Sequence, residues 1–361
     1  MVVPAAGAPA RIEPVLVDAP GPGEVRVRVV ANGVCHSDLW AIANGNWGVP
    51  FPMLLGHEGA GVVESVGEGV DHLEPGDEVL LAWAVPCGTC EACTRGRPRR
   101  CGHGWVQPPR VANGEGAELR GTLSIGSLAT HTVVHAAQAI PVPKGLSLTH
   151  ACLLGCGAST GLGAALNTAP VQPDDCVAVI GLGGIGLSAL QGARLAGAAR
   201  VIAVDRVATK LEMAERLGAT DVIDALVEDP VEAVRAATDG GVDVAFEATG
   251  HAAVVSQAVA MLRRAGTAVA IGVPAPDSTV TLDWGEATPG AAYPTKATLK
   301  VTDGGDPLAE DFEEWMDAAV DGRLDLGSMV SVEAPFTDEA LTEAFRAMLA
   351  GEVIRTVICF D

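Results

Sequence analysis

The sequence predicts an α/β protein with a β-rich part, then a doubly wound parallel sheet, then a shorter part of mixed character. Up to about residue 157, short valine-rich runs are separated by glycine and proline turns, which is typical of antiparallel strands. From there to about residue 300, short apolar runs alternate with helical stretches, which indicates a parallel sheet covered by helices. We therefore expect changes of domain near residues 157 and 300.

Length, composition and charge restrict the class of protein. A chain of 361 residues exceeds one comfortable core, so two domains are expected. Its 48% hydrophobic and 19% charged residues describe a globular, enzyme-like chain. The net charge of −22 argues against nucleic acid and anionic membranes as partners. No apolar run reaches the roughly 18 residues of a membrane span, and Met1 starts no signal-peptide pattern, so we expect a cytoplasmic protein.

The β-rich part shows strand character in several stretches. Alternating or valine-rich segments occupy residues 12–30, 59–70, 78–83 and 131–142, and turn residues lie between them. No internal repeat or long linker interrupts the chain.

Residues 177–205 carry a nucleotide-binding motif. A short apolar strand precedes G-x-G-x-x-G, a helical stretch follows, and a second strand ends at Asp205. A lone G-x-G-x-x-G is weak, but the strand–helix–strand context makes it specific, and a glycine turn without a ligand becomes the poorer alternative. Asp205 would accept ribose hydroxyls and repel a 2′-phosphate, so NAD is predicted, and Lys210 lies one turn beyond. The loop glycines are Gly181, Gly183, Gly184 and Gly186.

The alternation continues beyond Asp205. Strands are predicted at 221–224, 242–249 and 267–273, and helices at 230–237 and 252–264. A doubly wound sheet binds its ligand at the carboxyl ends of its strands. These ends are predicted at Ile180, Asp205, Thr249 and Val273. The acidic run 310–314 is predicted to be a solvated helix face.

Four cysteines are crowded into residues 87–101. The spacing C-x2-C-x2-C-x7-C is typical of metal ligands in a reducing compartment, and disulfides are the alternative. Four thiolates fit a closed, structural zinc site. The ligands would be Cys87, Cys90, Cys93 and Cys101. The remaining Cys152, Cys176 and Cys359 lie in apolar runs and are predicted to be small buried hydrophobes.

A second metal site is indicated between residues 33 and 58. Cys35 and His57 offer a thiolate and an imidazole, which zinc prefers. Asp38 and Glu58 are carboxylates beside these two residues, where they could orient the imidazole. A third ligand is needed, and Cys156 is the best candidate because it lies just before the nucleotide-binding segment. A buried free cysteine and a core histidine are the alternative.

Together these motifs resemble the zinc-dependent medium-chain alcohol dehydrogenases, over nearly the whole chain. The matching stretches are residues 33–38, 56–61, 87–101, 155–161, 181–186 and 354–356. The resemblance implies a GroES-like catalytic domain (1–157, with the structural zinc lobe 87–101, and 301–361) into which a Rossmann domain (158–300) is inserted. It also implies two zinc ions per chain, NAD, a small alcohol or aldehyde as substrate, and a homodimer or homotetramer.

The resemblance also implies residue roles. Cys35, His57 and Cys156 would hold the catalytic zinc, with Glu58 and Asp38 beside it. Ser37 would take the alcohol proton. Thr160, Ile185 and Ile271 would position the alcohol and the nicotinamide. His36 and Arg355 would contact the pyrophosphate.

One position departs from the family pattern. Well-known members carry a histidine where this chain has Trp40, and an indole cannot carry a proton to solvent at neutral pH. The proton would then leave from Ser37 and the ribose to water or another group. Trp40, Trp83 and Trp105 are expected to shape an apolar substrate pocket, and packing between strands is the alternative for Trp105 and for Trp47.

The expected activity is NAD-linked oxidation of a primary or aromatic alcohol, or the reverse reduction. One alternative is oxidation of the adduct of formaldehyde with a thiol, which needs a basic patch for the carboxylates of the thiol compound. The chain offers little for such a patch beyond Arg95, Arg97, Arg99, Arg100 and Arg110. The other alternative is a nucleotide-binding relative without catalysis.

Overall fold

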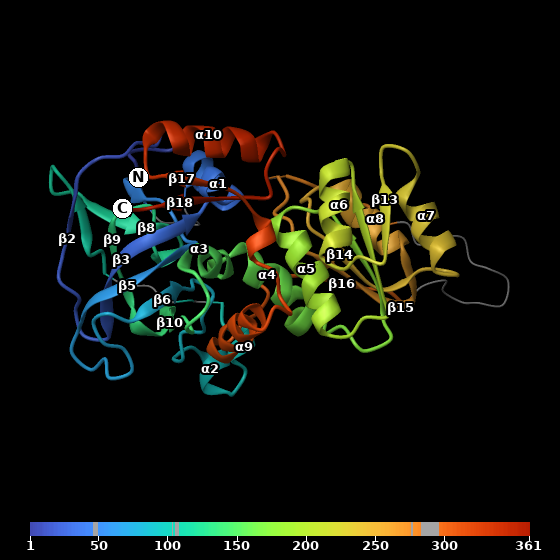
Figure 1. The fold of residues 1–361 in the computed structure, drawn as a ribbon, viewed down its shortest axis with the longest axis horizontal. Helices are drawn as coiled ribbons and strands as arrows, with labels where there is room; N and C mark the ends of the chain where they lie inside the picture. The colour runs from blue at the N-terminus through green and yellow to red at the C-terminus, as the bar shows by residue number, and fades with distance from the viewer. Residues whose placement is uncertain (46–49, 103, 105–107, 276, 283–295) are drawn as a thin grey trace. The chain divides into compact units, whose positions relative to one another are not determined.

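The computed structural model of the protein describes residues 1–361 except 46–49, 103, 105–107, 276 and 283–295. The chain divides into two compact units (Figure 1). Unit 1 comprises Met1–Gly157 and Pro307–Asp361, and unit 2 comprises Ala158–Asp306. Unit 2 is therefore an insertion in the chain of unit 1. No helix in the described ranges is long and apolar enough to cross a membrane.

Unit 1 is built mainly on sheets. One sheet has the strand order β10-β6-β5-β3-β18-β17, with β9 also pairing with β3, and the other has the order β1-β4-β8-β7-β2. The strands are β1 (Val2–Val3), β2 (Val15–Val17), β3 (Glu24–Gly33), β4 (Met53–Leu54), β5 (Gly59–Val66), β6 (Glu78–Leu81), β7 (Val111–Asn113), β8 (Glu118–Gly121), β9 (His131–His135), β10 (Ala139–Pro141), β17 (Val330–Pro335) and β18 (Arg355–Cys359).

Strand β3 is central to unit 1. Its alternating valines Val25, Val27 and Val29 are buried, as the period of two in its sequence requires. Its carboxyl end, residues 31–33, pairs antiparallel with residues 357–359 of β18. The end of the chain thus completes the sheet that carries the residues before Cys35.

Short and long helices surround these sheets. Helix α10 is capped by Thr337, whose hydroxyl accepts from the N–H of Ala340, and it packs Leu341 and Phe345 into the core beside β18. The helices of unit 1 are α1 (His36–Asn44), α2 (Glu91–Thr94), α3 (Leu148–Ala151), α9 (Ala309–Val320) and α10 (Asp338–Leu349), with 3-10 segments η1 (Pro98–Arg100), η2 (Thr122–Ser124), η3 (Ala136–Gln138), η4 (Cys152–Gly155) and η6 (Gly327–Met329).

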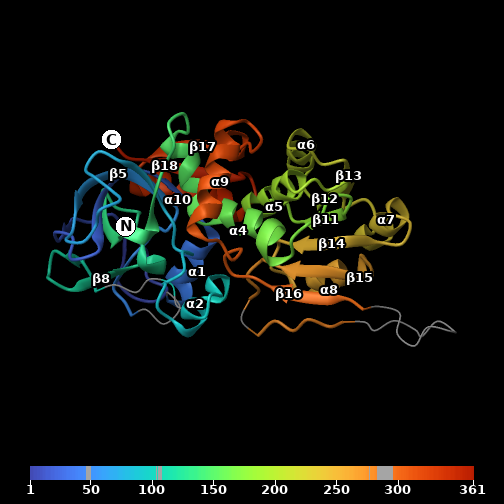
Figure 2. The same ribbon diagram turned by 90° about the horizontal axis from the view of Figure 1, so that it is seen from below.

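Unit 2 is a parallel sheet with helices on both faces (Figure 2), as the alternating sequence predicts. Its order is β13-β12-β11-β14-β15-β16. All strands run parallel, and the order in which successive strands are added reverses between β11 and β14. The strands are β11 (Cys176–Ile180), β12 (Arg200–Asp205), β13 (Asp221–Asp224), β14 (Val242–Glu247), β15 (Leu262–Ala270) and β16 (Thr298–Val301). The helices are α4 (Gly157–Gly163), which leads into the unit, the π-helical segment η5 (Ala164–Thr168), α5 (Gly184–Leu195), α6 (Ala208–Arg216), α7 (Pro230–Ala237) and α8 (Ala252–Ala260).

The predictions of a helix to residue 264 and a strand from 267 to 273 are wrong at their ends. Helix α8 stops at Ala260 and β15 starts at Leu262. The N–H of Val242 donates to the carbonyl of Met261 at 2.9 Å, which draws the chain into the sheet as soon as the helix ends. Val273, predicted at the carboxyl end of this strand, follows it in a loop and is 62% exposed.

The prediction of a solvated acidic face at residues 310–314 is wrong for one residue. Asp311, in the first turn of α9, is only 8% exposed. Its carboxylate accepts from Arg99 at 2.5 and 2.9 Å and from the N–H of Leu308 at 2.6 Å. This ion pair ties the cysteine lobe to the returning part of the chain within unit 1.

Candidate metal and cofactor sites

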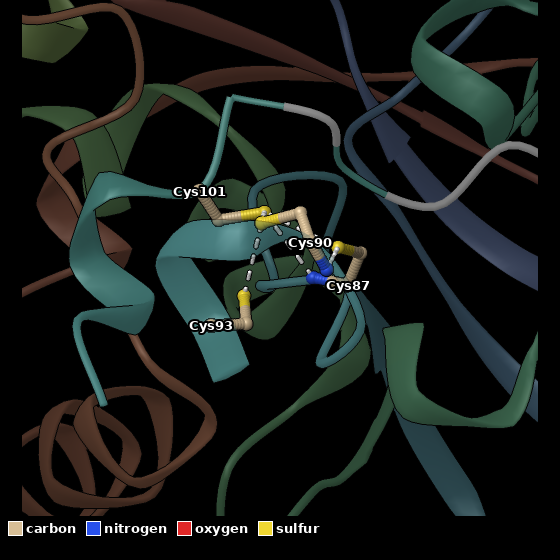
Figure 3. Close-up of side chains that lie close together, drawn as sticks. All are labelled: Cys87, Cys90, Cys93 and Cys101. Atoms are coloured by element: carbon tan, nitrogen blue, oxygen red, sulfur yellow. Dashed lines mark hydrogen bonds between the residues drawn. The ribbon is translucent and has the colours of Figure 1, made fainter. Parts of the chain in front are cut away.

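The four cysteines of residues 87–101 meet in one cluster (Figure 3). Helix α2 and segment η1 bring Cys93 and Cys101 back to the loop that holds Cys87 and Cys90. Their sulfur atoms lie within 4.8 Å of one another, and neighbouring sulfurs are 3.5, 3.6 and 3.8 Å apart. Four thiolates about 2.3 Å from a tetrahedral zinc lie about 3.8 Å apart, so the cluster fits this ion.

The chemistry of the cysteines agrees with metal binding. The backbone N–H of Thr89 lowers the pKa of the Cys87 thiol to about 6, against the opposing effect of burial. A thiolate is the form that binds zinc. All nine cysteines have free thiols, and the disulfide alternative is therefore not realised in the structure. Cys152 is fully buried as predicted, whereas Cys176 and Cys359 are only partly buried.

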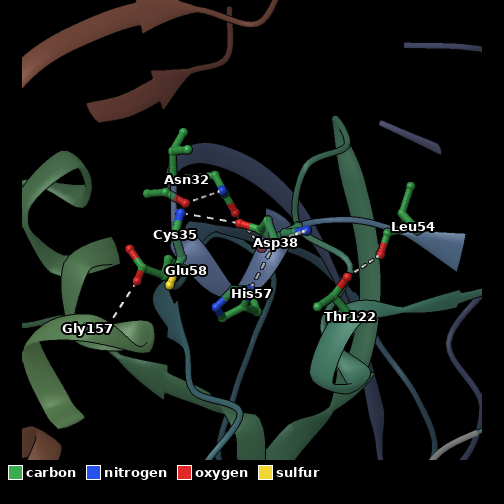
Figure 4. Close-up of polar contacts among 12 residues, drawn as sticks. Asn32, Cys35, Asp38, Leu54, His57, Glu58, Thr122 and Gly157 are labelled. Carbon is green, nitrogen blue, oxygen red and sulfur yellow. Dashed lines mark hydrogen bonds and ion pairs between the residues drawn. The ribbon is translucent and has the colours of Figure 1, made fainter. Parts of the chain in front are cut away.

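A second cluster lies wholly within unit 1 and is buried (Figure 4). It consists of Cys35, His57 and Glu58, which Figure 4 labels, together with Cys156. The ligand atoms of all four residues lie within 4.8 Å of one another. Strand β3 and helix α1 hold Cys35, the loop before β5 holds His57 and Glu58, and η4 ends next to Cys156. In the described part of the chain, His57 Nε2 and Glu58 Oε2 are buried and find no hydrogen-bond partner. Buried polar atoms left in this way beside two thiols fit a bound zinc ion.

Asp38 holds this cluster together from the first turn of α1. Its carboxylate accepts from His57 Nδ1 at 3.1 Å, from the N–H of Gly56 at 3.2 Å and from the N–H of Cys35 at 3.3 Å. Burial alone would lower the pKa of His57, but the charge and hydrogen bond of Asp38 raise it well above its ordinary value. With Nδ1 bonded to Asp38, the imidazole turns Nε2 toward the thiols, as in other histidine metal ligands.

Glu58 links the cluster to Arg355. Its Oε1 accepts from the N–H of Gly157 at 3.1 Å and lies 3.4 Å from Arg355 Nη2. Burial raises the pKa of Glu58 to about 7, although Arg355 opposes this shift. Arg355 is 6% exposed and also donates to the carbonyl of Val34 at 3.2 Å. The sequence does not predict this pairing, because the two residues are far apart in the chain.

The other predicted catalytic and pocket residues of unit 1 that the structure describes lie on helix α1 or just after strand β6. Ser37 is half-buried and His36 is exposed, both in the first turn of α1, and Trp40 follows on the same helix. Trp83 follows β6, packs against the core around Val25, and has a buried indole N–H without a partner among the described residues. Trp105 and Trp47 lie outside the described residues.

Unit 2 carries the predicted nucleotide-binding residues other than His36 and Arg355, which belong to unit 1. The glycine-rich loop joins β11 to α5, and Gly181 has a φ of +90°, which favours glycine. Asp205 ends β12 and accepts from the N–H of Leu182 at 2.6 Å, so its carboxylate lies beside the glycine loop. It also accepts from the backbone of Arg206 and Val207. The other predicted residues are Thr160, buried on α4 with a hydroxyl lacking a partner in the described ranges, half-buried Ile185 on α5, half-buried Lys210 on α6, and buried Ile271 after β15.

Two family profiles match this chain, the alcohol dehydrogenase GroES-like domain over residues 21–144 and the zinc-binding dehydrogenase over residues 184–321. Alcohol dehydrogenase class-3 of Myxine glutinosa is 35% identical over 371 residues, which covers 97% of this chain and 94% of that protein. The chain belongs to the zinc-dependent medium-chain alcohol dehydrogenases. S-(hydroxymethyl)glutathione dehydrogenase of Saccharomyces cerevisiae is 34% identical over 98% of this alcohol dehydrogenase and 94% of its own length.

Solved structures agree with this membership. An alcohol dehydrogenase zinc-binding domain protein from Burkholderia ambifaria has a TM-score of 0.90 and 34% identity, over 100% of this alcohol dehydrogenase and 98% of its own chain. Benzyl alcohol dehydrogenase from Acinetobacter calcoaceticus has a TM-score of 0.88 and 32% identity, with the same coverage. The predicted fold, a Rossmann sheet inserted in a GroES-like domain, is confirmed. The protein is an NAD-dependent zinc enzyme, and its two ligand clusters fit two zinc ions per chain.

Proposed function

We propose that this alcohol dehydrogenase oxidises uncharged primary or aromatic alcohols to aldehydes with NAD, and reduces the aldehydes in the reverse direction. The observation that carries the proposal is the buried cluster of Cys35, His57 and Cys156, with His57 Nε2 left without a partner in the described residues. Three protein ligands leave a fourth position open for a substrate oxygen, which distinguishes a catalytic zinc site from a closed one.

The residues around this cluster would divide the work. Zinc held by Cys35, His57 and Cys156 would act as a Lewis acid that stabilises the alkoxide form of the substrate. Ser37, two positions after Cys35 in the first turn of α1, would take the hydroxyl proton. Asp38 would fix the orientation of His57. Glu58 and Arg355 would form a buried ion pair beside the zinc ligands.

Charge supports an uncharged substrate over a thiol adduct that carries carboxylates. Five arginines are the sequence's main candidates for an anion-binding patch. Three of them already face carboxylates: Arg95 lies 2.9 Å from Glu91, Arg99 2.5 Å from Asp311, and Arg110 2.7 Å from Glu24. These pairs reduce the positive charge available to a substrate, in a chain whose net charge is −22. Among the relatives, benzyl alcohol dehydrogenase represents the favoured class and S-(hydroxymethyl)glutathione dehydrogenase the other.

A substrate panel tests the proposal. NADH formation would be measured with benzyl alcohol, ethanol, 2-propanol and S-(hydroxymethyl)glutathione, together with the zinc content of the same preparation. We expect the highest kcat/KM with benzyl alcohol or a primary alcohol, and a loss of about 10²–10⁴-fold in Ser37→Ala, the usual size of a missing proton-transfer group. A preference for the glutathione adduct would overturn the substrate class. Two bound zinc ions with no alcohol-dependent NADH would indicate a relative without catalysis.

Trp40 makes the exit of the proton a separate question. We propose that the proton passes from Ser37 and the ribose to water, because the indole at position 40 cannot carry it. A slow exit predicts a solvent isotope effect on alcohol oxidation that shrinks in Trp40→His. An isotope effect near unity in both proteins would leave Trp40 only as a wall of the substrate pocket.

We also propose a reducing, cytoplasmic location, which the free thiols of all nine cysteines favour. A homodimer or homotetramer stays a prediction from the family resemblance, and sedimentation of the zinc-loaded enzyme tests it. Labelling of accessible thiols in intact cells would test the location, because an oxidising compartment predicts blocked cysteines.

A further inference from the structure

Glu247 is a fully buried carboxylate inside unit 2 that the proposed function does not use. It is the last residue of β14, where the chain turns into the loop 248–250. One of its oxygens, Oε1, accepts from the N–H of Thr249 at 2.6 Å, from the N–H of Gly250 at 2.9 Å, and from the Thr249 hydroxyl. A single side chain therefore holds two of the three backbone N–H groups of this loop.

The loop fixed by Glu247 lies between the ends of two neighbouring strands. The N–H of Ala248 donates to the carbonyl of Ile180, the last residue of β11, at 2.9 Å. On the other side, the N–H groups of Ile271 and Gly272 donate to the carbonyl of Glu247 at 2.8 and 3.1 Å. Glu247 thus stands at the point where the strand order reverses, which is where sheets of this kind bind their ligand.

The hydrogen bond from the Thr249 hydroxyl to Glu247 orients a side chain whose methyl group lies against the glycine-rich loop. A Cβ built at Gly181 would lie 2.6 Å from Cγ2 of Thr249, so the threonine methyl group packs directly against the first glycine of the loop. A Cβ at Gly272 would lie 2.0 Å from the nitrogen of Gly250. The loop 248–250 is therefore closely packed on both sides, against the glycine-rich loop and against the segment that holds Ile271.

We propose that Glu247 is a positioning residue for NAD, which sets the glycine-rich loop through Thr249 and Gly250 before the cofactor binds. This inference rests on the NAD-binding part of the proposed function. Binding to a protein whose competent arrangement is only partly populated weakens the apparent affinity by that fraction. A neutral group at position 247 would hold the loop less firmly, because hydrogen bonds to a charged acceptor are about twice as strong as neutral ones.

The sign of the effect separates positioning from simple electrostatics. NAD is an anion, so removal of a nearby negative charge strengthens its binding if charge alone matters. Positioning predicts the opposite, a weaker binding of NAD when the carboxylate becomes an amide. Glu247→Gln keeps the shape of the side chain, and Glu228→Gln, on an exposed turn after β13, is a matched loss of one charge in the same unit.

The test is the Kd of NADH, measured by calorimetry on the zinc-loaded enzyme, with thermal unfolding and kcat at saturating NAD on the same samples. We expect the Kd of Glu247→Gln to rise about three- to tenfold with kcat within about twofold of wild type, and Glu228→Gln to bind as well as wild type or better. Thr249→Val, which keeps the methyl group against Gly181 and loses the hydroxyl bond, should raise the Kd in the same direction.

An unchanged or lower Kd in Glu247→Gln overturns the inference. If Glu247→Gln does not fold, Thr249→Val decides alone, and an unchanged Kd in that variant also overturns it. Wild-type enzyme that binds no NADH would instead contradict the NAD-binding function itself, so the two failures are distinguishable.

Discussion

Replacement of Asp38 by asparagine tests how the buried metal cluster is held. Asp38 accepts three hydrogen bonds, two at Oδ1 from His57 and Gly56 and one at Oδ2 from Cys35. Asparagine has nearly the same shape but only one acceptor oxygen. If that oxygen stays with His57 and Gly56, the amide NH₂ must face the N–H of Cys35, so one buried donor loses its partner.

The expected loss of zinc affinity follows from these hydrogen bonds. A hydrogen bond to a charged group contributes about 1.5–3 kcal/mol and a neutral one about 1 kcal/mol, so each retained bond is also weakened. Part of this loss acts equally on the metal-free protein. We therefore expect zinc affinity at this cluster to fall by about 10–100-fold, the usual effect of losing the partner of a ligating histidine. That range corresponds to roughly 1.4–2.7 kcal/mol.

The assay is zinc competition with a chromophoric chelator, followed by NADH formation. The four-cysteine cluster is an internal reference, because its zinc should be released as in wild type. Asp77→Asn is a control in a turn of the same unit, where the carboxylate accepts from the N–H of Glu74 at 2.8 Å and no metal ligand is near in sequence. Activity of Asp38→Asn should recover when excess zinc is added. Wild-type affinity for both zinc ions in this variant would refute the role given to Asp38.

Three further predictions address other parts of the molecule. Cys90→Ser should lose about one zinc per chain and lower the unfolding temperature, because a closed site contributes folding energy directly; metal analysis checks this, with Cys176→Ser as the control, and one zinc or none in wild type would contradict it. Asp205→Gly should reduce the preference for NAD over NADP by at least about tenfold, since it removes charge-assisted hydrogen bonds and the repulsion of a 2′-phosphate; comparable use of both cofactors by wild type would count against this. Burial lowers the pKa of His135, whose Nδ1 accepts from the N–H of Ala137 at 3.1 Å. The unfolded chain therefore binds a proton at this residue before the folded chain does, and the free energy of unfolding falls as the pH drops below about 6.5. Urea unfolding at two pH values should show a smaller loss of stability in His135→Asn than in wild type, and equal losses would exclude this group.

Local patterns predicted most of the fold. The strand–glycine–helix order of unit 2 follows from residues that are neighbours in sequence, and the structure has β11, the loop and α5 at those positions. The boundary near residue 262 was not predictable in this way. Leu262 continues an apolar helical pattern, and it belongs to a strand because the N–H of Val242, some twenty positions earlier, claims the carbonyl of Met261. A local sequence pattern cannot predict a helix end that depends on a backbone hydrogen bond to a distant residue.

The candidate site shows the same division. Cys35, His57 and Cys156 could be singled out because zinc restricts its ligands to a few residue types. The pairing of Arg355 with Glu58 and of Arg99 with Asp311 could not, because ion pairs between residues far apart in the chain follow no spacing rule. Glu247 had a usable signal: it ends an apolar strand two positions before Thr249-Gly250, and a carboxylate is costly to bury without donors.

The pairing of β3 with β18 has a consequence for how the enzyme is made. Domains fold as their residues leave the ribosome, beginning with the N-terminal part. Residues 31–33 lack their partners 357–359 until almost the entire chain has been synthesised. Val34, whose N–H bonds to Thr356, and the adjoining Cys35 wait equally long. The residues of the cysteine lobe are all available early in synthesis, whereas the strand before Cys35 gains its partner β18, and Glu58 gains Arg355, only after the nucleotide-binding unit has been translated.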